Sequence, residues 1–369
     1  MIQNSSADYI DNVSLDKNMI DKPIDKKMAK IMMDKAGGPA INEGQKERLL
    51  SIKNLSVSFS IDDGTFKAVD NISFDIFRGE NIGLVGESGC GKSVTALSIP
   101  RLIPSPPGKM EADELLFDHQ DLMKMAPAQL RKIRGKAISM IFQEPLSALS
   151  PLHRIGHQMV ETVLLHKDMS RRDAWGFAEK WLKKVGIADA GERMFAYPFQ
   201  LSGGMQQRIM IAMALMLEPN LIIADEPTTA LDVTTQAQVF ELIRGMKQNE
   251  TSMLLITHDM GVVLEMCEKV LVMYASEIVE TGTREDIFFN PRHPYTIGLL
   301  NAIPKLSGNR TKLKDIPGQV PSPFDYPKGC HFQKRCEHAF DRCAEQRPSL
   351  YSCSRGHQAA CFLVDNTGS

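Results

Sequence analysis

Residues 86–93 read GESGCGKS and fit the motif G-x-x-x-x-G-K-[ST]. In this motif, glycines let backbone N–H groups approach phosphate oxygens, and the N-terminus of the next helix adds partial positive charge. We expect Lys92 to contact the β- and γ-phosphates and the Ser93 hydroxyl to ligate Mg²⁺. The apolar run 82–85 precedes the loop, as a strand in such a site should. The sequence therefore predicts a phosphate site made of Gly86, Glu87, Ser88, Gly89, Cys90, Gly91, Lys92 and Ser93.

Two acidic residues end another apolar run. Residues 221–224 read LIIA and are followed by Asp225 and Glu226. A carboxylate at the end of a buried strand is held rigidly, and its oxygens suit Mg²⁺. The segment LSGGMQQR lies between this pair and the phosphate loop, at residues 201–208. Each flanking motif alone indicates nucleotide binding, and the order of the three is more specific.

These three motifs, in this order, resemble the ATP-binding subunits of ATP-binding cassette (ABC) transporters, in which LSGGMQQR is the family signature. The resemblance implies an ATPase that binds ATP and Mg²⁺. It also implies that Asp225 coordinates Mg²⁺ through water and that Glu226 polarises the attacking water as general base. Residues 227–232, PTTALD, continue the family pattern.

His258 and Gln143 complete the catalytic set that the resemblance implies. His258 follows the apolar run 253–256 and matches the family's switch histidine, which contacts the γ-phosphate. Gln143, within IFQEP, matches the glutamine that senses Mg²⁺ and the attacking water. The expected catalytic residues are Glu226, His258 and Gln143, and the expected Mg²⁺ ligands are Ser93, Gln143 and Asp225.

The signature motif calls for a second chain. Ser202, Gly203 and Gly204 are expected to open a helix over residues 205–217, which presents a hydroxyl and free N–H groups to an anion. By resemblance, that anion is the γ-phosphate of ATP bound to another subunit. Two cassettes would then dimerise head to tail around ATP, and closure of this dimer would drive alternating access in membrane partners.

Adenine needs a flat apolar partner, which an aromatic side chain in the first strands usually supplies by stacking. Phe59 is the first candidate and Phe66 the second. The alternative is that both belong to the core, as phenylalanines in strands normally do.

An α/β fold with two kinds of sheet must position these residues. Alternating apolar residues at 55, 57 and 59, and at 72, 74 and 76, predict antiparallel strands. Continuous apolar runs at 82–85, 221–224, 253–256 and 270–273 predict parallel strands with helices on both faces. We expect a P-loop NTPase fold of the ABC cassette type, with a RecA-like parallel core sheet, an antiparallel β subdomain and an inserted helical subdomain.

Composition along the chain predicts three segments. Residues 1–47 are rich in Asp, Lys, Asn and Ser and should be a disordered extension. Residues 48–290 should form the nucleotide-binding domain, with its helical subdomain at about 151–218. Residues 291–369 should form a separate C-terminal module that is rich in proline and ends in a group of cysteines.

The overall composition is that of an ordinary globular protein. The hydrophobic fraction is 43%, and a net charge of −2 without a basic stripe argues against nucleic acid. No run reaches the roughly 18 apolar residues of a membrane-spanning helix. Acidic and basic residues interrupt any secretory signal near the N-terminus. We therefore expect a cytoplasmic chain that needs membrane partners for any transport role. The resemblance implies a peripheral position on the cytoplasmic face of the inner membrane.

Four further segments narrow the resemblance. Residues 142–145, 225–238, 273–275 and 290–296, the last reading NPRHPYT, resemble the first of the two ATPases in bacterial dipeptide and oligopeptide importers. This resemblance covers about residues 48–364 and implies a heterodimer with a second ATPase, two permeases and an extracytoplasmic substrate-binding protein. The alternative within the class is an importer of nickel or another small solute. A soluble ABC ATPase of DNA repair or translation is the alternative from another class, which one cassette without a heptad insertion disfavours.

Five of the seven cysteines lie in the last forty residues. In a reducing cytosol such a group indicates a metal more often than disulfides. The resemblance implies a [4Fe–4S] cluster on Cys330, Cys336, Cys343 and Cys361, with Cys353 left over. The spacing C-x5-C-x6-C differs from the tight C-x-x-C of structural zinc sites. Zinc and free thiols are the alternatives.

Overall fold

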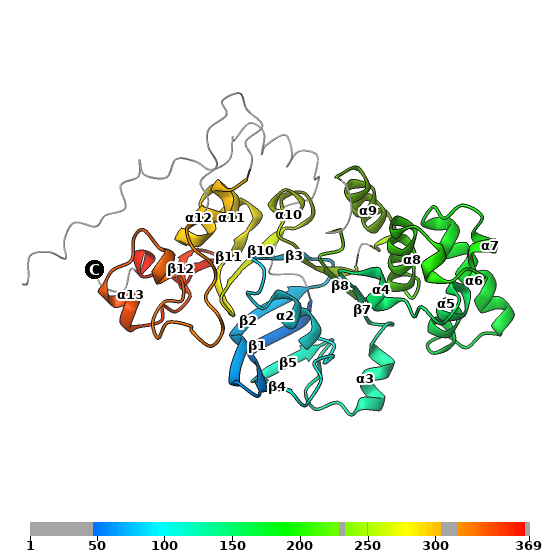
Figure 1. Ribbon diagram of the computed structural model, residues 1–369, viewed down its shortest axis with the longest axis horizontal. Helices are drawn as coiled ribbons and strands as arrows, with labels where there is room; N and C mark the ends of the chain where they lie inside the picture. The colour runs from blue at the N-terminus through cyan, green and yellow to red at the C-terminus, as the bar shows by residue number, and fades with distance from the viewer. Residues whose placement is uncertain (1–46, 229–232, 249, 304–315, 366–369) are drawn as a thin grey trace, which may run out of the picture.

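Two β-sheets organise the part of the chain that this computed structural model describes, residues 47–228, 233–248, 250–303 and 316–365 (Figure 1). The extension expected at residues 1–47 lies outside these residues except for Glu47. The predicted α/β cassette architecture, with one antiparallel and one mainly parallel sheet, is confirmed.

The smaller sheet is antiparallel and comes from the first part of the chain. Strands β1 (Arg48–Ile61) and β2 (Gly64–Phe77) form a long hairpin around a turn at Asp62 and Asp63. Leu55 and Val57 are fully buried, which the alternating pattern requires. The other strands of this sheet are β4 (Gly108–Glu111), β5 (Glu114–Phe117) and β6 (Gln120–Asp121).

The larger sheet carries the candidate site. Its order is β12-β13-β11-β10-β3-β9-β8-β7, and the central strands are parallel. Every residue of β8 and β9 is buried, which explains their continuous apolar sequences. The parallel strands are β3 (Asn81–Val85), β7 (Ile138–Ile141), β8 (Leu221–Asp225), β9 (Ser252–Ile256) and β10 (Lys269–Tyr274).

Helices lie on both sides of this sheet. Figure 1 shows α9 (Val233–Met246), α10 (Met260–Met266) and α11 (Arg284–Phe289) on one side. On the other side lie α2 (Lys92–Ser98), α3 (Pro127–Ile133) and the antiparallel sheet. None of the described helices is long and apolar enough to cross a membrane.

The predicted helical insertion forms a separate lobe at one end of the molecule (Figure 1). Helix α6 buries Ala178, Trp181 and Leu182, the face that their three- and four-residue spacing predicts. The lobe contains α4 (Pro145–Ala148), α5 (Ile155–Leu164), α6 (Arg171–Lys184), α7 (Ala190–Arg193), the 3-10 turn η1 (Pro198–Gln200) and α8 (Gly203–Leu215).

The C-terminal segment extends the larger sheet. Strand β13 (His357–Ala359) pairs with β11 (Glu277–Thr283), and β12 (Tyr351–Ser354) pairs with β13. The sheet therefore continues across the predicted boundary at residue 291. Short helices fill the rest of the segment: α12 (Pro294–Asn301), η2 (Gln333–Arg335), α13 (Asp341–Glu345) and η3 (Phe362–Val364).

Candidate functional site

The phosphate loop joins the end of β3 to the start of α2, and its glycines are sterically required. Gly86 has φ +155° and Gly91 φ +106°. A Cβ atom on Gly86 would lie 2.1 Å from the carbonyl oxygen of Met273, and one on Gly91 would lie 2.2 Å from that of Ala68. Only glycine fits at these two positions.

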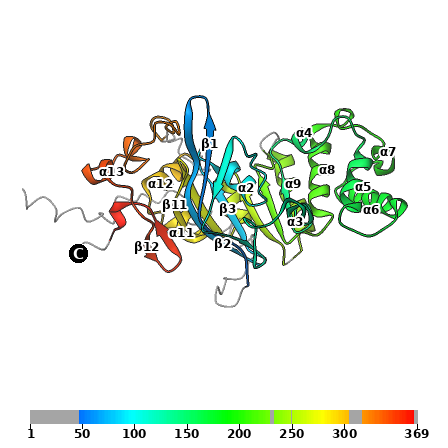
Figure 2. The same cartoon turned by 90° about the horizontal axis from the view of Figure 1, so that it is seen from below.

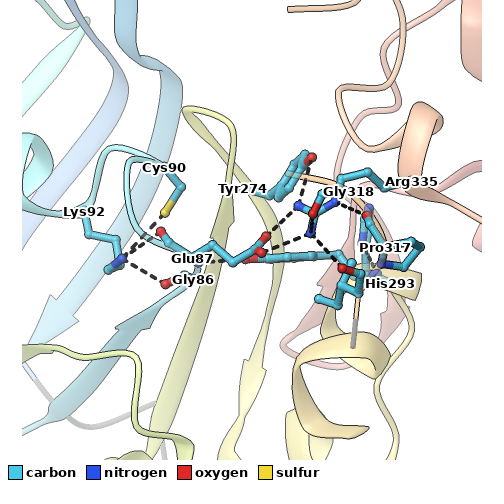
Figure 3. Close-up of polar contacts among 11 residues, drawn as sticks. Gly86, Glu87, Cys90, Lys92, Tyr274, His293, Pro317, Gly318 and Arg335 are labelled. Carbon is cyan, nitrogen blue, oxygen red and sulfur yellow. Dashed lines mark hydrogen bonds and ion pairs between the residues drawn. The ribbon is translucent and has the colours of Figure 1, made fainter. Parts of the chain in front are cut away.

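Lys92 folds back over the loop (Figure 3). Its Nζ donates to the carbonyl oxygens of Gly86 and Glu87, at 2.9 Å each, and the residue is only 5% exposed. The ammonium therefore lies against the loop backbone, where a bound phosphate could take the place of these carbonyl oxygens as its partner.

Ser93 and Asp225 bring together two oxygens that suit Mg²⁺. The Ser93 hydroxyl, in the first turn of α2, donates to Asp225 Oδ1 at the end of β8, over 3.1 Å. Burial raises the pKa of the Asp225 carboxyl and neighbouring Glu226 adds to the effect, whereas the bond from Ser93 opposes it. Hydroxyl and carboxylate oxygens are ligands of Mg²⁺, so this pair fits the ion.

The side chains of Gln143 and His258, the two other expected catalytic residues, both lie next to the Glu226 carboxylate. Gln143 Nε2 donates to Glu226 Oε2 at 3.3 Å, and His258 Nδ1 lies 3.5 Å from the same oxygen. The three residues follow β7, β8 and β9, whose carboxyl ends meet at one sheet edge because the strands are parallel and adjacent. The structure thus brings together the catalytic residues predicted from the sequence.

The signature segment presents a helix N-terminus to open space. Ser202 caps α8 by accepting a hydrogen bond from the Met205 N–H at 3.4 Å. Ser202 and Gly203 are exposed, and a Cβ on Gly203 or Gly204 would meet no atom within 4 Å. Figures 1 and 2 place α8 in the helical lobe, apart from α2. Within one chain the signature and the phosphate loop therefore occupy different places.

The signature helix contacts the segment that follows β8 through a residue with no role in the predicted site. Gln207 is buried and its Nε2 donates to the carbonyl oxygen of Pro227, directly after Glu226. The only hint of this contact in the sequence is that Gln207 lies inside the signature motif.

Phe59 lies in β1 and packs among aromatic side chains. Its ring stacks on Phe66 with 5.8 Å between ring centres, and Phe66 contacts Phe324 edge-on at 5.1 Å. Phe59 is partly buried. A partly buried aromatic ring is compatible both with a place in the core and with stacking on adenine.

The four expected cysteine ligands gather around one cavity. Cys330, Cys336, Cys343 and Cys361 line it, and Cys353 does not. The cavity measures about 20 Å³, roughly one water molecule. No group of three or more His, Cys, Asp or Glu side chains in the described ranges is arranged to hold a metal ion. The expected iron–sulfur ligands therefore share a cavity, but their side chains are not arranged to hold a metal ion.

Burial also favours the protonated form of two of these thiols. It raises the pKa of Cys330 to about 11 and that of Cys361 to about 12. Metal binding would release these protons, because the thiolate is the ligand.

Two residues of the C-terminal segment contact the phosphate loop at Glu87, and Figure 3 shows the one that binds its carboxylate. They are Tyr295 and Arg335. Tyr295 stands in the NPRHPYT pattern, but Arg335 is 248 positions from Glu87, and the sequence analysis gave it no role.

Comparisons with known proteins agree with this geometry. The chain matches the ABC transporter family over residues 69–229 and the oligopeptide/dipeptide transporter C-terminal region over residues 279–343. It is 48% identical to the dipeptide transport ATP-binding protein DppD of Bacillus subtilis, over 86% of this chain and 96% of the relative. It is 44% identical to the protein of that name in Escherichia coli, over 87% and 98%.

Solved structures show the same fold. A dimeric ATP-binding cassette in a post-hydrolysis state, bound to ADP and Pi, superimposes with a TM-score of 0.57 at 27% identity. The match covers 64% of this chain and 99% of that one. With 48% identity to a relative covered almost completely, the chain belongs to the ATP-binding subunits of ABC transporters, in the group that carries the oligopeptide and dipeptide transporter C-terminal region.

Proposed function

We propose that this chain is the ATPase subunit that powers uptake of dipeptides or oligopeptides through a pore formed by other subunits. The observation that carries the proposal is the meeting of Gln143 and His258 on one carboxylate oxygen of Glu226. The match to the oligopeptide/dipeptide transporter C-terminal region supports peptides as the cargo.

We assign the site residues the following roles, which fit their positions. The loop N–H groups and Lys92 hold the phosphates of ATP, and Ser93 and Asp225 hold Mg²⁺, which neutralises phosphate charge. Glu226 accepts a proton from the water that attacks the γ-phosphorus, while the bond from that phosphorus to the β-phosphate oxygen breaks. Gln143 and His258 orient this carboxylate and the water. Phe59 stacks on adenine.

The exposed start of α8 supports a composite site. Ser202, Gly203 and Gly204 would contact ATP held by a partner cassette, and related solved cassettes are dimers. We propose a heterodimer with a second ATPase, on the cytoplasmic face of the inner membrane, bound to two permeases that receive cargo from an extracytoplasmic binding protein. This chain alone should hydrolyse ATP slowly, and the sister subunit should restore the rate.

Uptake by a strain that lacks this subunit tests the proposal. Wild-type protein should restore accumulation of a labelled dipeptide, and Lys92→Ala should not. Restored accumulation of nickel instead of peptide would favour the small-solute alternative. Purification from membranes without any permease would favour a soluble ATPase and overturn the transport role.

The cysteines allow a second proposal, in which the C-terminal module, residues 291–369 beside the 48–290 nucleotide-binding domain, holds a metal group. The support is that four thiols line one cavity. Thiolates would hold a [4Fe–4S] cluster or, alternatively, zinc. The cavity has room for one small ion, so a cluster would require the cysteine-bearing loops to move apart.

Metal analysis of anaerobically purified protein decides this proposal. A cluster gives about four iron and four sulfide per chain. Cys336→Ser should lose them, and Cys353→Ser, whose thiol lies outside the cavity, should keep them. Stoichiometric zinc without iron would show that the thiols hold zinc and not a cluster. Absence of both metals would refute a resident metal.

A further inference from the structure

A buried arginine of the C-terminal segment binds the side chain of a phosphate-loop residue (Figure 3). Arg335 Nη1 donates to Glu87 Oε2 at 2.7 Å, and Nη2 donates to Oε1 at 3.0 Å. Such a two-bond pairing of guanidinium with carboxylate is stronger and more directional than a single ion pair. The arginine side chain is only 5% exposed and that of Glu87 is 31% exposed, so the pair is partly shielded from solvent and salt.

Arg335 is held in place from its own side. Its Nε donates to the carbonyl oxygen of Pro317 at 2.8 Å. Its guanidinium lies 5.7 Å from the ring centre of Tyr274 and 5.9 Å from that of Phe332, both of which are buried. The guanidinium therefore has little freedom to follow Glu87 if the loop moves.

A second bond holds the backbone of the same loop residue. The Glu87 N–H donates to the Tyr295 hydroxyl at 2.8 Å, and Tyr295 is fully buried. The Tyr295 ring packs on Tyr274 and Phe332, with ring centres 4.6 and 5.5 Å apart. The same aromatic group thus supports both partners of Glu87.

The arginine also belongs to the turn between two cavity cysteines. Arg335 ends η2, where Gln333 N–H donates to the Cys330 carbonyl at 3.1 Å and Cys336 N–H donates to the Gln333 carbonyl at 3.3 Å. Cys330 and Cys336 both line the cavity. The turn between Cys330 and Cys336 therefore also carries the arginine that binds the phosphate loop.

The phosphate loop needs such support for two reasons. Its glycines, Gly86, Gly89 and Gly91, all adopt positive φ, and a glycine-rich loop must lose much conformational freedom to bind a ligand. Glu87 also places a negative charge in a loop that receives phosphates. Arg335 neutralises this charge and turns the carboxylate to the side opposite Lys92 (Figure 3).

We propose that Arg335 is a positioning residue for ATP binding: by holding Glu87, it fixes the phosphate loop in its binding shape and removes the repulsion of phosphate. The C-terminal segment then sets the ATP affinity of the cassette to which it is attached. This inference rests on the proposed ATP site and adds a residue that the family motifs do not contain.

Titration of the full-length chain with ATP tests the clamp. Arg335→Gln should raise the Kd for ATP by between about 2- and 30-fold. Adding Glu87→Gln to Arg335→Gln should restore part of the affinity, because no unpaired carboxylate remains near the phosphates. In the assembled transporter, KM for ATP should rise in proportion, while kcat at saturating ATP stays within about twofold.

Arg347 offers a matched control. It also joins the C-terminal segment to the cassette, through Asp70 at 2.8 Å and Glu277 at 2.9 Å, and neither acid is in the phosphate loop. Arg347→Gln should leave the Kd for ATP unchanged. An equal loss of affinity in Arg347→Gln and Arg335→Gln would overturn the clamp in favour of general docking of the segment.

Two further variants keep the outcomes distinct. If Arg335→Gln is insoluble, Arg335→Lys takes its place. The lysine keeps the charge but loses the two-bond geometry, so the Kd for ATP should still rise above that of wild type, by less than the rise expected for Arg335→Gln. An unchanged Kd in soluble Arg335 variants would overturn the inference. Lys92→Ala should abolish binding in every case; retained binding in Lys92→Ala would refute the ATP site itself.

Discussion

The Ser93 hydroxyl lies 3.1 Å from Asp225 Oδ1, although the two residues are 132 positions apart. One comes from the first turn of α2 and the other from the end of β8. The parallel sheet brings them together, so the fold itself places the two oxygens that we propose as Mg²⁺ ligands.

Removal of this hydroxyl should weaken Mg²⁺ binding. In Ser93→Ala, we expect the Mg²⁺ concentration for half-maximal ATP hydrolysis to rise at least about tenfold, because one ligand oxygen is lost. Ser98→Ala is the control, since Ser98 Oγ donates to the Val94 carbonyl on the same helix and not to Asp225. An unchanged Mg²⁺ requirement in Ser93→Ala would remove Ser93 from the metal site.

Replacement of Glu226 by glutamine should stop hydrolysis and keep ATP bound. Glu226→Gln retains the shape of the side chain but cannot accept a proton from water, so kcat should fall by about 100-fold or more. The ATP-bound dimer with the sister subunit should accumulate, as gel filtration and phosphate release would measure. Glu241→Gln, an exposed acid on α9, should behave as wild type. Undiminished turnover in Glu226→Gln would refute the general base.

A methyl group on Gly91 should be far more damaging than one on Gly89. Both residues have positive φ, but the new Cβ would lie 2.2 Å from the Ala68 carbonyl oxygen in Gly91→Ala and near no atom in Gly89→Ala. Urea denaturation should show a loss of about 3 kcal/mol or more for Gly91→Ala and about 1 kcal/mol for Gly89→Ala. Equal losses of stability in the two variants would mean that the strain of positive φ sets the cost, and not the contact with the Ala68 carbonyl oxygen.

The features that could be predicted from the sequence depend on short stretches of neighbouring residues. The runs at 221–224 and 253–256 became β8 and β9 because strands buried on both faces need continuous apolar sequence. The proposed catalytic residues Glu226 and His258 follow these strand ends closely, so the parallel sheet brings their side chains together.

Contacts across the chain could not be predicted in this way. No local pattern links Arg335 to Glu87. Strands β12 and β13 span only four and three residues, too few for a two-residue period to stand out in the sequence. The sequence predicted that four of the C-terminal cysteines share a metal group. They do line one cavity, but spacing alone does not report how their side chains are arranged, and the described side chains are not arranged to hold a metal ion.

Glu277 gives the protein a pH-dependent stability. Burial raises the pKa of this carboxyl from 4.5 to about 7, and Asp70 adds to the rise while Arg347, 2.9 Å away, opposes it. Between these two values the folded chain keeps a proton that the unfolded chain has lost. This residue therefore lowers the free energy of unfolding as pH rises from 4.5 to about 7, by up to about 3 kcal/mol.

Glu277→Gln should remove this dependence because glutamine does not titrate. Relative to wild type, the variant should gain stability progressively as pH rises from about 5 to 7 and keep a constant advantage above that range. Urea denaturation across this range measures the difference. Glu285→Gln, an exposed partner of Arg284, should run parallel to wild type at every pH. A Glu277→Gln curve that also runs parallel to wild type would show that Glu277 is ionised in the folded protein throughout, with the ion pair to Arg347 outweighing burial.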